Sequence, residues 1–218
     1  MKKKSLFSLA AFVVGTGATA FALISSGLVM ADIPPAPEIG TKVANFTMKD
    51  YEGKEHSLEA HKGQIVVLSF TSHKCPVSKG CEKAFAETAA KYKEKGVVFL
   101  SIDSHNSTPP AEIKEYATAS NDTGKTLPYP ILKDEGNVYA DTLGAKVTPE
   151  IYIVDKEGKL AYHGALDNSN DYKPGTAEYK NYVAQALDEL LADKPVSLPK
   201  QSAYGCTIKR VAGKKTAS

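Results

Sequence analysis

The amino-acid sequence predicts an α/β fold in which a central mixed sheet is flanked by helices. Two apolar runs, IVVLSF and VVFLSI, are each followed by a segment with helical periodicity, which is typical of parallel strands joined by helices. Two further apolar segments flank residues 156–159 (KEGK), a turn suited to a hairpin, so we expect the last strands to be antiparallel. The 218 residues suffice for one domain with a sizeable core.

The predicted domain, residues 38–194, is divided by apolar periodicity and by turn residues. In the helix after the first buried strand, Val77, Phe85 and Tyr92 share one face, and Gly96 ends the helix. In chain order the predicted elements are an extended pair (44–49 and 55–58), a strand (64–70), a helix (77–94), a strand (97–103), a helix (111–120), a strand (129–132), a short helix (137–143), a hairpin (150–155 and 160–164) and an amphipathic helix (176–192).

The N-terminus has the layout of a secretory signal peptide. Three lysines, Lys2–Lys4, precede an apolar segment from Leu6 to Val29, and the small residue Ala31 offers a cleavage site before Asp32. The apolar segment is also long enough for an uncleaved membrane anchor, which is the alternative. Either way we expect the rest of the chain to be exported, periplasmic or otherwise extracytoplasmic, with membrane contact only through residues 1–31. A proline-rich linker, residues 32–37, follows.

The charge balance of the mature chain excludes one class of partner. Removal of residues 1–31 takes away three lysines and no acids, which leaves 24 of the 27 basic residues against 25 acidic ones. Because a near-neutral chain with no basic face lacks the footprint of a nucleic-acid-binding protein, no nucleic-acid partner is expected. No cofactor is expected either.

The segment TSHKCPVSKGC, residues 71–81, contains the strongest candidate for chemistry. Cys75 lies where the first buried strand gives way to a helix, so unpaired N–H groups and the positive end of the helix dipole favour its thiolate. Pro76 suits the first helical position, and the charge of Lys74 lowers the thiol pKa further. Ser72 and Ser78 are expected to donate hydrogen bonds to the sulfur. The sequence therefore predicts that Cys75 is the nucleophile.

Two other cysteines are candidates to resolve an intermediate formed on Cys75. Cys206 lies in a polar tail, residues 195–218, that can fold back onto the domain, and it is the preferred resolving cysteine. Cys81 is the alternative, but six helical positions from Cys75 correspond to about 9 Å of rise, so a bond between them requires the helix to unwind. Cys81 also shares the apolar face of the helix, which favours core packing.

The sequence resembles the AhpC/TSA-like redoxin branch of the thioredoxin superfamily over about residues 38–210. The segments that carry the resemblance are the entry EIGTKVANF (38–46), the VTPE motif (147–150) before IYIVD, and the GCTIK ending (205–209), typical of a peroxiredoxin-like thioredoxin subgroup. The resemblance implies a thioredoxin-like fold and a cis bond between Thr148 and Pro149, facing the active cysteine. It also implies thiol-dependent redox activity.

The chain departs from the active-site motifs of both thioredoxins and peroxiredoxins. Ser78 occupies the position of the second cysteine in the CxxC motif of thioredoxins. Leu68 replaces the motif proline of peroxiredoxins, with Ser72 in place of the threonine. The single arginine, Arg210, lies in the tail rather than in the core. These departures predict measurable thiol–disulfide exchange and slow peroxide reduction.

Two classes of function remain at this point. The first is an exported thiol-dependent oxidoreductase that acts on a protein disulfide or a peroxide and is reduced by an external thiol. The alternative is a non-catalytic metal-binding or protein-docking module on the same fold. A copper site made by His73, Cys75 and Cys81 would fit that alternative, although the spacing of the cysteines is unusual for one.

Overall fold

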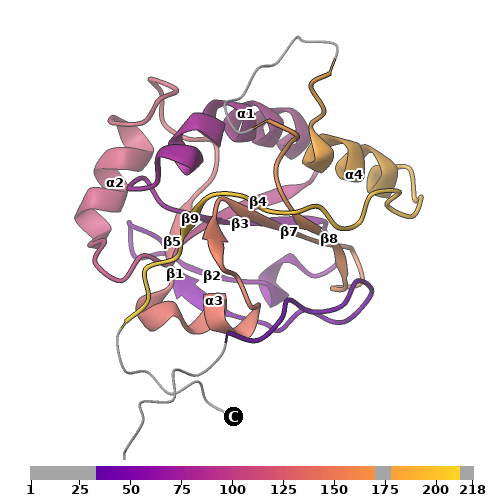
Figure 1. The fold of residues 1–218 in the computed structure, drawn as a ribbon, viewed down its shortest axis with the longest axis horizontal. Coiled ribbons are helices and arrows are strands. Elements are labelled where there is room, and N and C mark those ends of the chain that lie inside the picture. The colour runs from indigo at the N-terminus through magenta and orange to yellow at the C-terminus, as the bar shows by residue number, and fades with distance from the viewer. Residues whose placement is uncertain (1–32, 170–177, 212–218) are drawn as a thin grey trace, which may run out of the picture. The chain divides into compact units, whose positions relative to one another are not determined.

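The computed structural model describes residues 33–169 and 178–211, and confirms the α/β class with a central mixed sheet flanked by helices (Figure 1). The central sheet has the strand order β5-β4-β3-β7-β8. The elements are β1 (Thr47–Lys49), β2 (Glu55–Ser57), η1 (Glu59–His61), β3 (Val66–Thr71), α1 (Pro76–Lys93), β4 (Val98–Asp103), α2 (Pro110–Thr118), β5 (Ile131–Lys133), η2 (Glu135–Asn137), α3 (Val138–Thr142), β6 (Val147–Thr148), β7 (Glu150–Val154), β8 (Leu160–Gly164), α4 (Tyr182–Leu191) and β9 (Cys206–Thr207).

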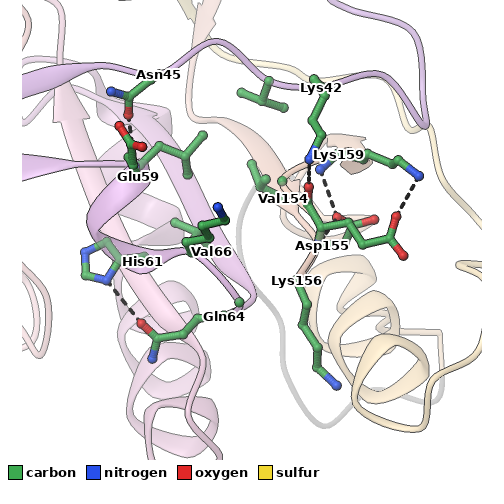
Figure 2. A pocket seen from close by; sticks show the side chains of 16 residues that line it. Lys42, Asn45, Glu59, His61, Gln64, Val66, Val154, Asp155, Lys156 and Lys159 are labelled. Carbon is green, nitrogen blue, oxygen red and sulfur yellow. Dashed lines mark hydrogen bonds and ion pairs between the residues drawn. The ribbon is translucent and has the colours of Figure 1, made fainter.

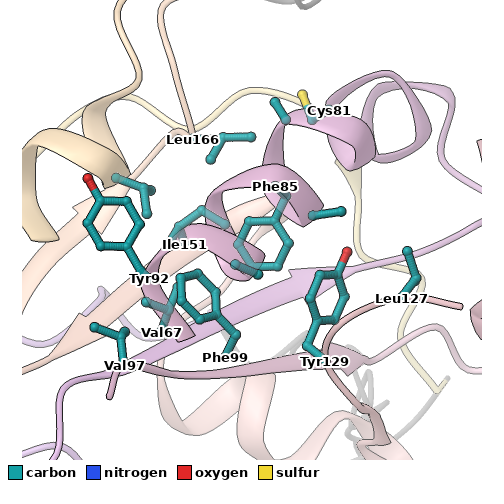
Figure 3. Packing of buried hydrophobic residues seen from close by; sticks show 14 of the residues in the cluster. Val67, Cys81, Phe85, Tyr92, Val97, Phe99, Leu127, Tyr129, Ile151 and Leu166 are labelled. Carbon is teal, nitrogen blue, oxygen red and sulfur yellow. The ribbon is translucent and has the colours of Figure 1, made fainter. Parts of the chain in front are cut away.

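The directions of the strands agree with the sequence pattern. β3, β4 and β5 run parallel, whereas β7 is antiparallel to both β3 and β8. Because successive side chains of a strand point to opposite faces, each apolar run supplies two cores. One core contains Val67 and Phe99 with the apolar faces of α1 and α4, and the other contains Leu68 and Leu100 with residues of β1 and α3. Figure 3 shows the first core, beneath α1.

The last helix begins later than predicted. Its expected start, Thr176, lies outside the described residues, but residues 178–180 are described and are not helical. The helix instead starts at Tyr182, because the side chain of Asn181 accepts a hydrogen bond from the backbone N–H of Ala184 (2.8 Å) and so caps the first turn. The predicted signal segment, residues 1–31, also lies outside the described residues. No helix within the described ranges is long and apolar enough to cross a membrane.

The C-terminal segment, residues 199–211, was predicted to belong to a tail that can fold back onto the domain. In the structure it pairs with the domain along its length (yellow in Figure 1). Near its start, the backbones of Pro199 and Gln201 each form a hydrogen bond of 3.0 Å with His163 of β8. Near its end, Ile208 is buried, and its N–H donates to the carbonyl of Lys146 (3.0 Å). We call this segment the C-terminal strap.

Two glycines allow the strap to lie this close to the domain. A Cβ atom at Gly164 would lie 1.9 Å from the carbonyl oxygen of Gln201. A Cβ atom at Gly205 would lie 2.0 Å from the carbonyl oxygen of Thr148. Both distances are far below any van der Waals contact, so only glycine permits the approach at these two places.

Candidate active site

Cys75 lies between β3 and α1, at the position that the sequence predicted. It is the N-cap residue of α1, and the backbone N–H of Ser78 donates to its sulfur (3.4 Å). Pro76 occupies the first turn, where its missing N–H leaves no intrahelical bond unmade. The side chain is only 2% exposed. The helix start therefore holds the sulfur in a fixed and enclosed position.

The loop before β7 covers Cys75 from the opposite side. The peptide bond between Thr148 and Pro149 is cis, as the resemblance implied. In the thiol form, Cys75 donates a hydrogen bond to the carbonyl oxygen of Thr148 (3.0 Å). Residue 148 thus lies directly against the reactive sulfur.

The strap brings Cys206 to the same place. β9 pairs antiparallel with β6, so that Cys206 lies opposite Thr148 and Thr207 lies opposite Val147. In this register Cys206 and Cys75 line the same small cleft. All three cysteines are free thiols here, and Cys206 is the least buried of them. The structure therefore brings together the two cysteines that a resolving reaction needs.

The pKa values of the two thiols are shifted in opposite directions. Burial by itself would raise the pKa of Cys75, but the hydrogen bonds from the Cys206 thiol and the Ser78 N–H outweigh burial and hold this pKa below its ordinary value. The hydrogen bond that Cys206 donates, together with partial burial, raises the pKa of Cys206. Cys75 is consequently the first of the pair to ionise, and it is the better nucleophile and the better leaving group.

The side chains of Ser72 and Lys74, which were predicted to support Cys75, have other partners, and the Ser78 hydroxyl has none among the described residues. The Ser72 hydroxyl accepts from the Lys74 N–H (3.2 Å) rather than donating to the thiol. The Ser78 hydroxyl is buried and has no partner among the described residues, since it is the backbone of Ser78 that contacts the sulfur. The Lys74 ammonium lies 3.3 Å from a Glu112 carboxylate oxygen. Its charge is therefore partly neutralised by α2.

The mouth of the site contains residues that sequence reasoning did not single out. A small cleft of about 60 Å³ opens at Cys75, with His105 and Lys209 on its wall. Burial, which outweighs the opposing charge of Asp103, lowers the pKa of His105, so this ring is neutral near pH 7. The cleft is lined by Ser72, Lys74, Cys75, His105, Thr148, Cys206, Thr207, Ile208 and Lys209.

Cys81 occupies a different environment, although it lies on the same helix. It is 2% exposed and belongs to the core that also contains Phe85 and Leu166 (Figure 3). Burial and then the nearby charge of Asp167 raise the pKa of Cys81 to about 11. α1 is continuous from Pro76 to Lys93, so the turn between Cys75 and Cys81 is intact. Cys81 packs as an apolar core residue and is poorly disposed to act as a thiolate.

The residues of the suggested copper site do not form one. His73 lies 2.6 Å from Glu112 and packs against the ring of Tyr116. Within residues 33–169 and 178–211, no three His, Cys, Asp or Glu side chains are grouped so that they could hold a metal ion.

The single arginine, Arg210, does not line the cleft at Cys75. Its guanidinium instead forms a hydrogen bond with Asp141 of α3 (2.7 Å).

A larger cavity lies at the opposite ends of the strands. It has a volume of about 670 Å³ and lies between the start of β3, at Val66, and the turn after β7, at Asp155 (Figure 2). Lys42 and Lys159 on its rim are tied to Glu157, Lys42 by the backbone carbonyl and Lys159 by the carboxylate. The cavity contains no cysteine, so it has no part in thiol chemistry at Cys75.

Comparison with known proteins agrees with this geometry. The AhpC/TSA family profile matches residues 39–163, more than half of the sequence. The chain belongs to the AhpC/TSA family. It is similar to the thiol-disulfide oxidoreductase ResA of Bacillus thuringiensis subsp. konkukian, with 30% identity over 164 residues, which cover 73% of this chain and 86% of the relative. These matches confirm the expected class, a thiol-dependent oxidoreductase.

Two further similarities support the AhpC/TSA assignment. The chloroplastic peroxiredoxin Q of Triticum aestivum is 32% identical over 148 residues, which cover 63% of this chain and 62% of the relative. The crystal structure of an uncharacterized conserved protein from Geobacillus kaustophilus superposes with a TM-score of 0.72 and 28% identity, covering 81% of this chain and 94% of that chain. Sequence relatives from both the thiol-disulfide and the peroxiredoxin branch confirm the predicted resemblance.

Proposed function

We propose that this protein is an exported thiol–disulfide oxidoreductase that alternates between a Cys75/Cys206 dithiol and a Cys75–Cys206 disulfide. The observation that carries the proposal is the register of β9, which sets Cys206 opposite Thr148 and in the same small cleft as Cys75. Cys75 is the nucleophile because its pKa is the lowered one of the pair. The Thr148 carbonyl oxygen lies 3.0 Å from the Cys75 sulfur.

The reaction consists of two exchanges of a sulfur–sulfur bond. The Cys75 thiolate attacks one sulfur of the substrate disulfide, forms a mixed disulfide, and releases the other substrate sulfur as a thiolate. Cys206 then loses its proton and attacks the Cys75 sulfur, which forms the Cys75–Cys206 disulfide and releases the second substrate thiolate. The substrate gains two electrons and the protein loses two. An external thiol reductant restores the dithiol by the reverse exchange.

A turnover assay with variants tests these roles. Wild-type protein, a small fluorogenic disulfide and a dithiol reductant should give continuous turnover. Cys75→Ser should abolish the enzymatic rate, and Cys206→Ser should accumulate the mixed disulfide on Cys75, visible by mass spectrometry. Cys81→Ser serves as the matched control, because Cys81 packs in the core. Retention of turnover in Cys75→Ser would refute the assignment.

Export rests on the N-terminal sequence. Lys2–Lys4, the apolar segment 6–29 and Ala31 support cleavage before Asp32, with membrane anchoring as the alternative. N-terminal sequencing of the native protein distinguishes the two. A mature chain beginning at Asp32 supports cleavage, whereas an intact Met1 in the membrane fraction supports an anchor.

A further inference from the structure

The edge of β6 beside Cys75 is the part of the molecule with the clearest unassigned role. We propose that this edge is the docking site for an extended, disulfide-bearing polypeptide, and that β9 occupies the site as an intramolecular competitor. The proposal rests on the proposed function, because it assumes that Cys75 is the nucleophile. It adds the substrate class, which is a polypeptide strand, and the route by which the substrate reaches the sulfur.

β6 forms a ladder with one other strand, β9. On its inner side, the backbone N–H groups of Lys146 and Val147 both donate to the Glu150 carboxylate (2.7 and 3.1 Å). On its outer side, it pairs with β9. Addition of a strand to such an edge is a general mode of peptide recognition, in which main-chain hydrogen bonds provide affinity. The outer side is therefore where a second strand can form a ladder, and β9 already fills it.

β9 also shows what a strand on this edge achieves. Its residue opposite Thr148 is a cysteine, and that cysteine lines the same small cleft as Cys75. A substrate strand in the same register would present its own cysteine sulfur to Cys75. While β9 is docked, however, Cys75 is 2% exposed and the adjoining cleft is about 60 Å³, which is room for a few water-sized molecules and not for a peptide. Polypeptide access thus requires β9 to leave.

Contacts on either side of β9 set how readily it leaves. Before it, the Tyr204 hydroxyl lies 2.9 Å from the carboxylate of Asp167, which is fully buried. After it, Ile208 is buried and Arg210 is paired with Asp141. None of these contacts involves Thr148. Loosening one of them should favour the substrate strand in the competition.

The same competition explains how a reduced substrate departs. After the first exchange, the substrate strand is bound to Cys75 by a disulfide and occupies the edge. The return of β9 displaces that strand and brings Cys206 to the Cys75 sulfur. The Cys75–Cys206 bond then forms, the bond to the substrate breaks, and the substrate thiol takes up the proton that Cys206 loses. The reduced substrate is therefore released in the same step that forms the Cys75–Cys206 disulfide.

The strap's own sequence supplies a sharp probe. A peptide with the sequence of residues 203–209, AYGCTIK, is prepared with its cysteine in a disulfide with thionitrobenzoate. Attack by Cys75 releases the coloured thionitrobenzoate. The matched control peptide is AYACTIK, because a Cβ at this glycine would lie 2.0 Å from the Thr148 carbonyl oxygen in the register of β9. Wild-type protein and Tyr204→Phe are compared with both peptides.

We expect the glycine peptide to react at least about tenfold faster than the alanine peptide, with wild-type protein as well as with the variant. Tyr204→Phe should raise the rate with the glycine peptide by about tenfold, since it removes a hydrogen bond to a charged, buried carboxylate. Equal rates for the two peptides with wild-type protein would overturn the docking register, whether or not the variant folds. An unchanged rate in folded Tyr204→Phe would overturn the competition. Failure of the proposed function is distinct: Cys75→Ser would then release thionitrobenzoate as fast as wild type.

Discussion

Replacement of Gly205 by alanine tests whether the strap positions the resolving cysteine. At this residue φ is +155°, and an added Cβ would lie 2.0 Å from the Thr148 carbonyl oxygen and 3.1 Å from the nitrogen of Pro149. Ordinary contact for a Cβ begins at about 3.4 Å, so β9 must retreat by about 1.4 Å from β6. Because a misplacement of about 1 Å can reduce a reaction rate by about 10²-fold, Cys75–Cys206 bond formation should slow by about that factor.

Rapid-quench trapping measures this rate. The reduced protein is mixed with a small disulfide, quenched with acid, and alkylated, and the fraction of the Cys75–Cys206 disulfide is followed with time. Gly124→Ala is the matched control, since Gly124 also has a positive φ (+65°) but an added Cβ there meets nothing within 4 Å. The mixed disulfide on Cys75 should still form in Gly205→Ala. An unchanged rate of intramolecular bond formation would refute the role assigned to the strap.

Two other substitutions and one labelling experiment give distinct expected outcomes. In Cys206→Ala, the pKa of Cys75 should rise, because the hydrogen bond from the Cys206 side chain that lowers it is lost; the pH dependence of Cys75 alkylation measures this shift. Cys81 should resist alkylation until the protein unfolds, since its pKa is about 11 and it is buried. Glu150→Gln should destabilise the fold by about 2 kcal/mol in urea denaturation, as it weakens charged hydrogen bonds to β6 and to His163. Hydrogen bonds from His163 and the backbone outweigh burial and hold the pKa of Glu150 below its usual 4.5, so this stabilisation should be present above about pH 4.5 and disappear as pH falls through the lower, folded-state pKa.

Local sequence signals were sufficient to place Cys75 at a helix N-terminus. A buried apolar strand, Cys75 and Pro76 in series specify a cysteine at a helix N-terminus, because each preference involves only neighbouring residues. The structure places the first helical residue at Pro76, one position before the predicted start at Val77. The cis bond at Pro149 was expected from the VTPE motif, and it is present.

Most long-range contacts could not be predicted from the sequence, although the return of the Cys206 segment to the domain was expected. β9 is two residues long, so it has no periodicity to detect, and the surrounding lysines suggest a solvated tail. The isolated apolar residue Ile208 and the glycine before Cys206 were the only local hints of docking. Partners such as Glu112 for His73 and Asp167 for Tyr204 are supplied by elements distant in the chain, and nothing in their local sequence indicates the pairing.

The central claim is that Cys75 and Cys206 form the redox pair, and disulfide mapping tests it most directly. The reduced full-length protein is treated briefly with a mild oxidant, free thiols are blocked, and the digest is analysed by mass spectrometry without reduction. The structure predicts one intramolecular bond, which joins the peptides containing Cys75 and Cys206 and leaves Cys81 as a blocked thiol that is labelled only after denaturation. A bond between Cys75 and Cys81, or bonds only between different molecules, would contradict the account.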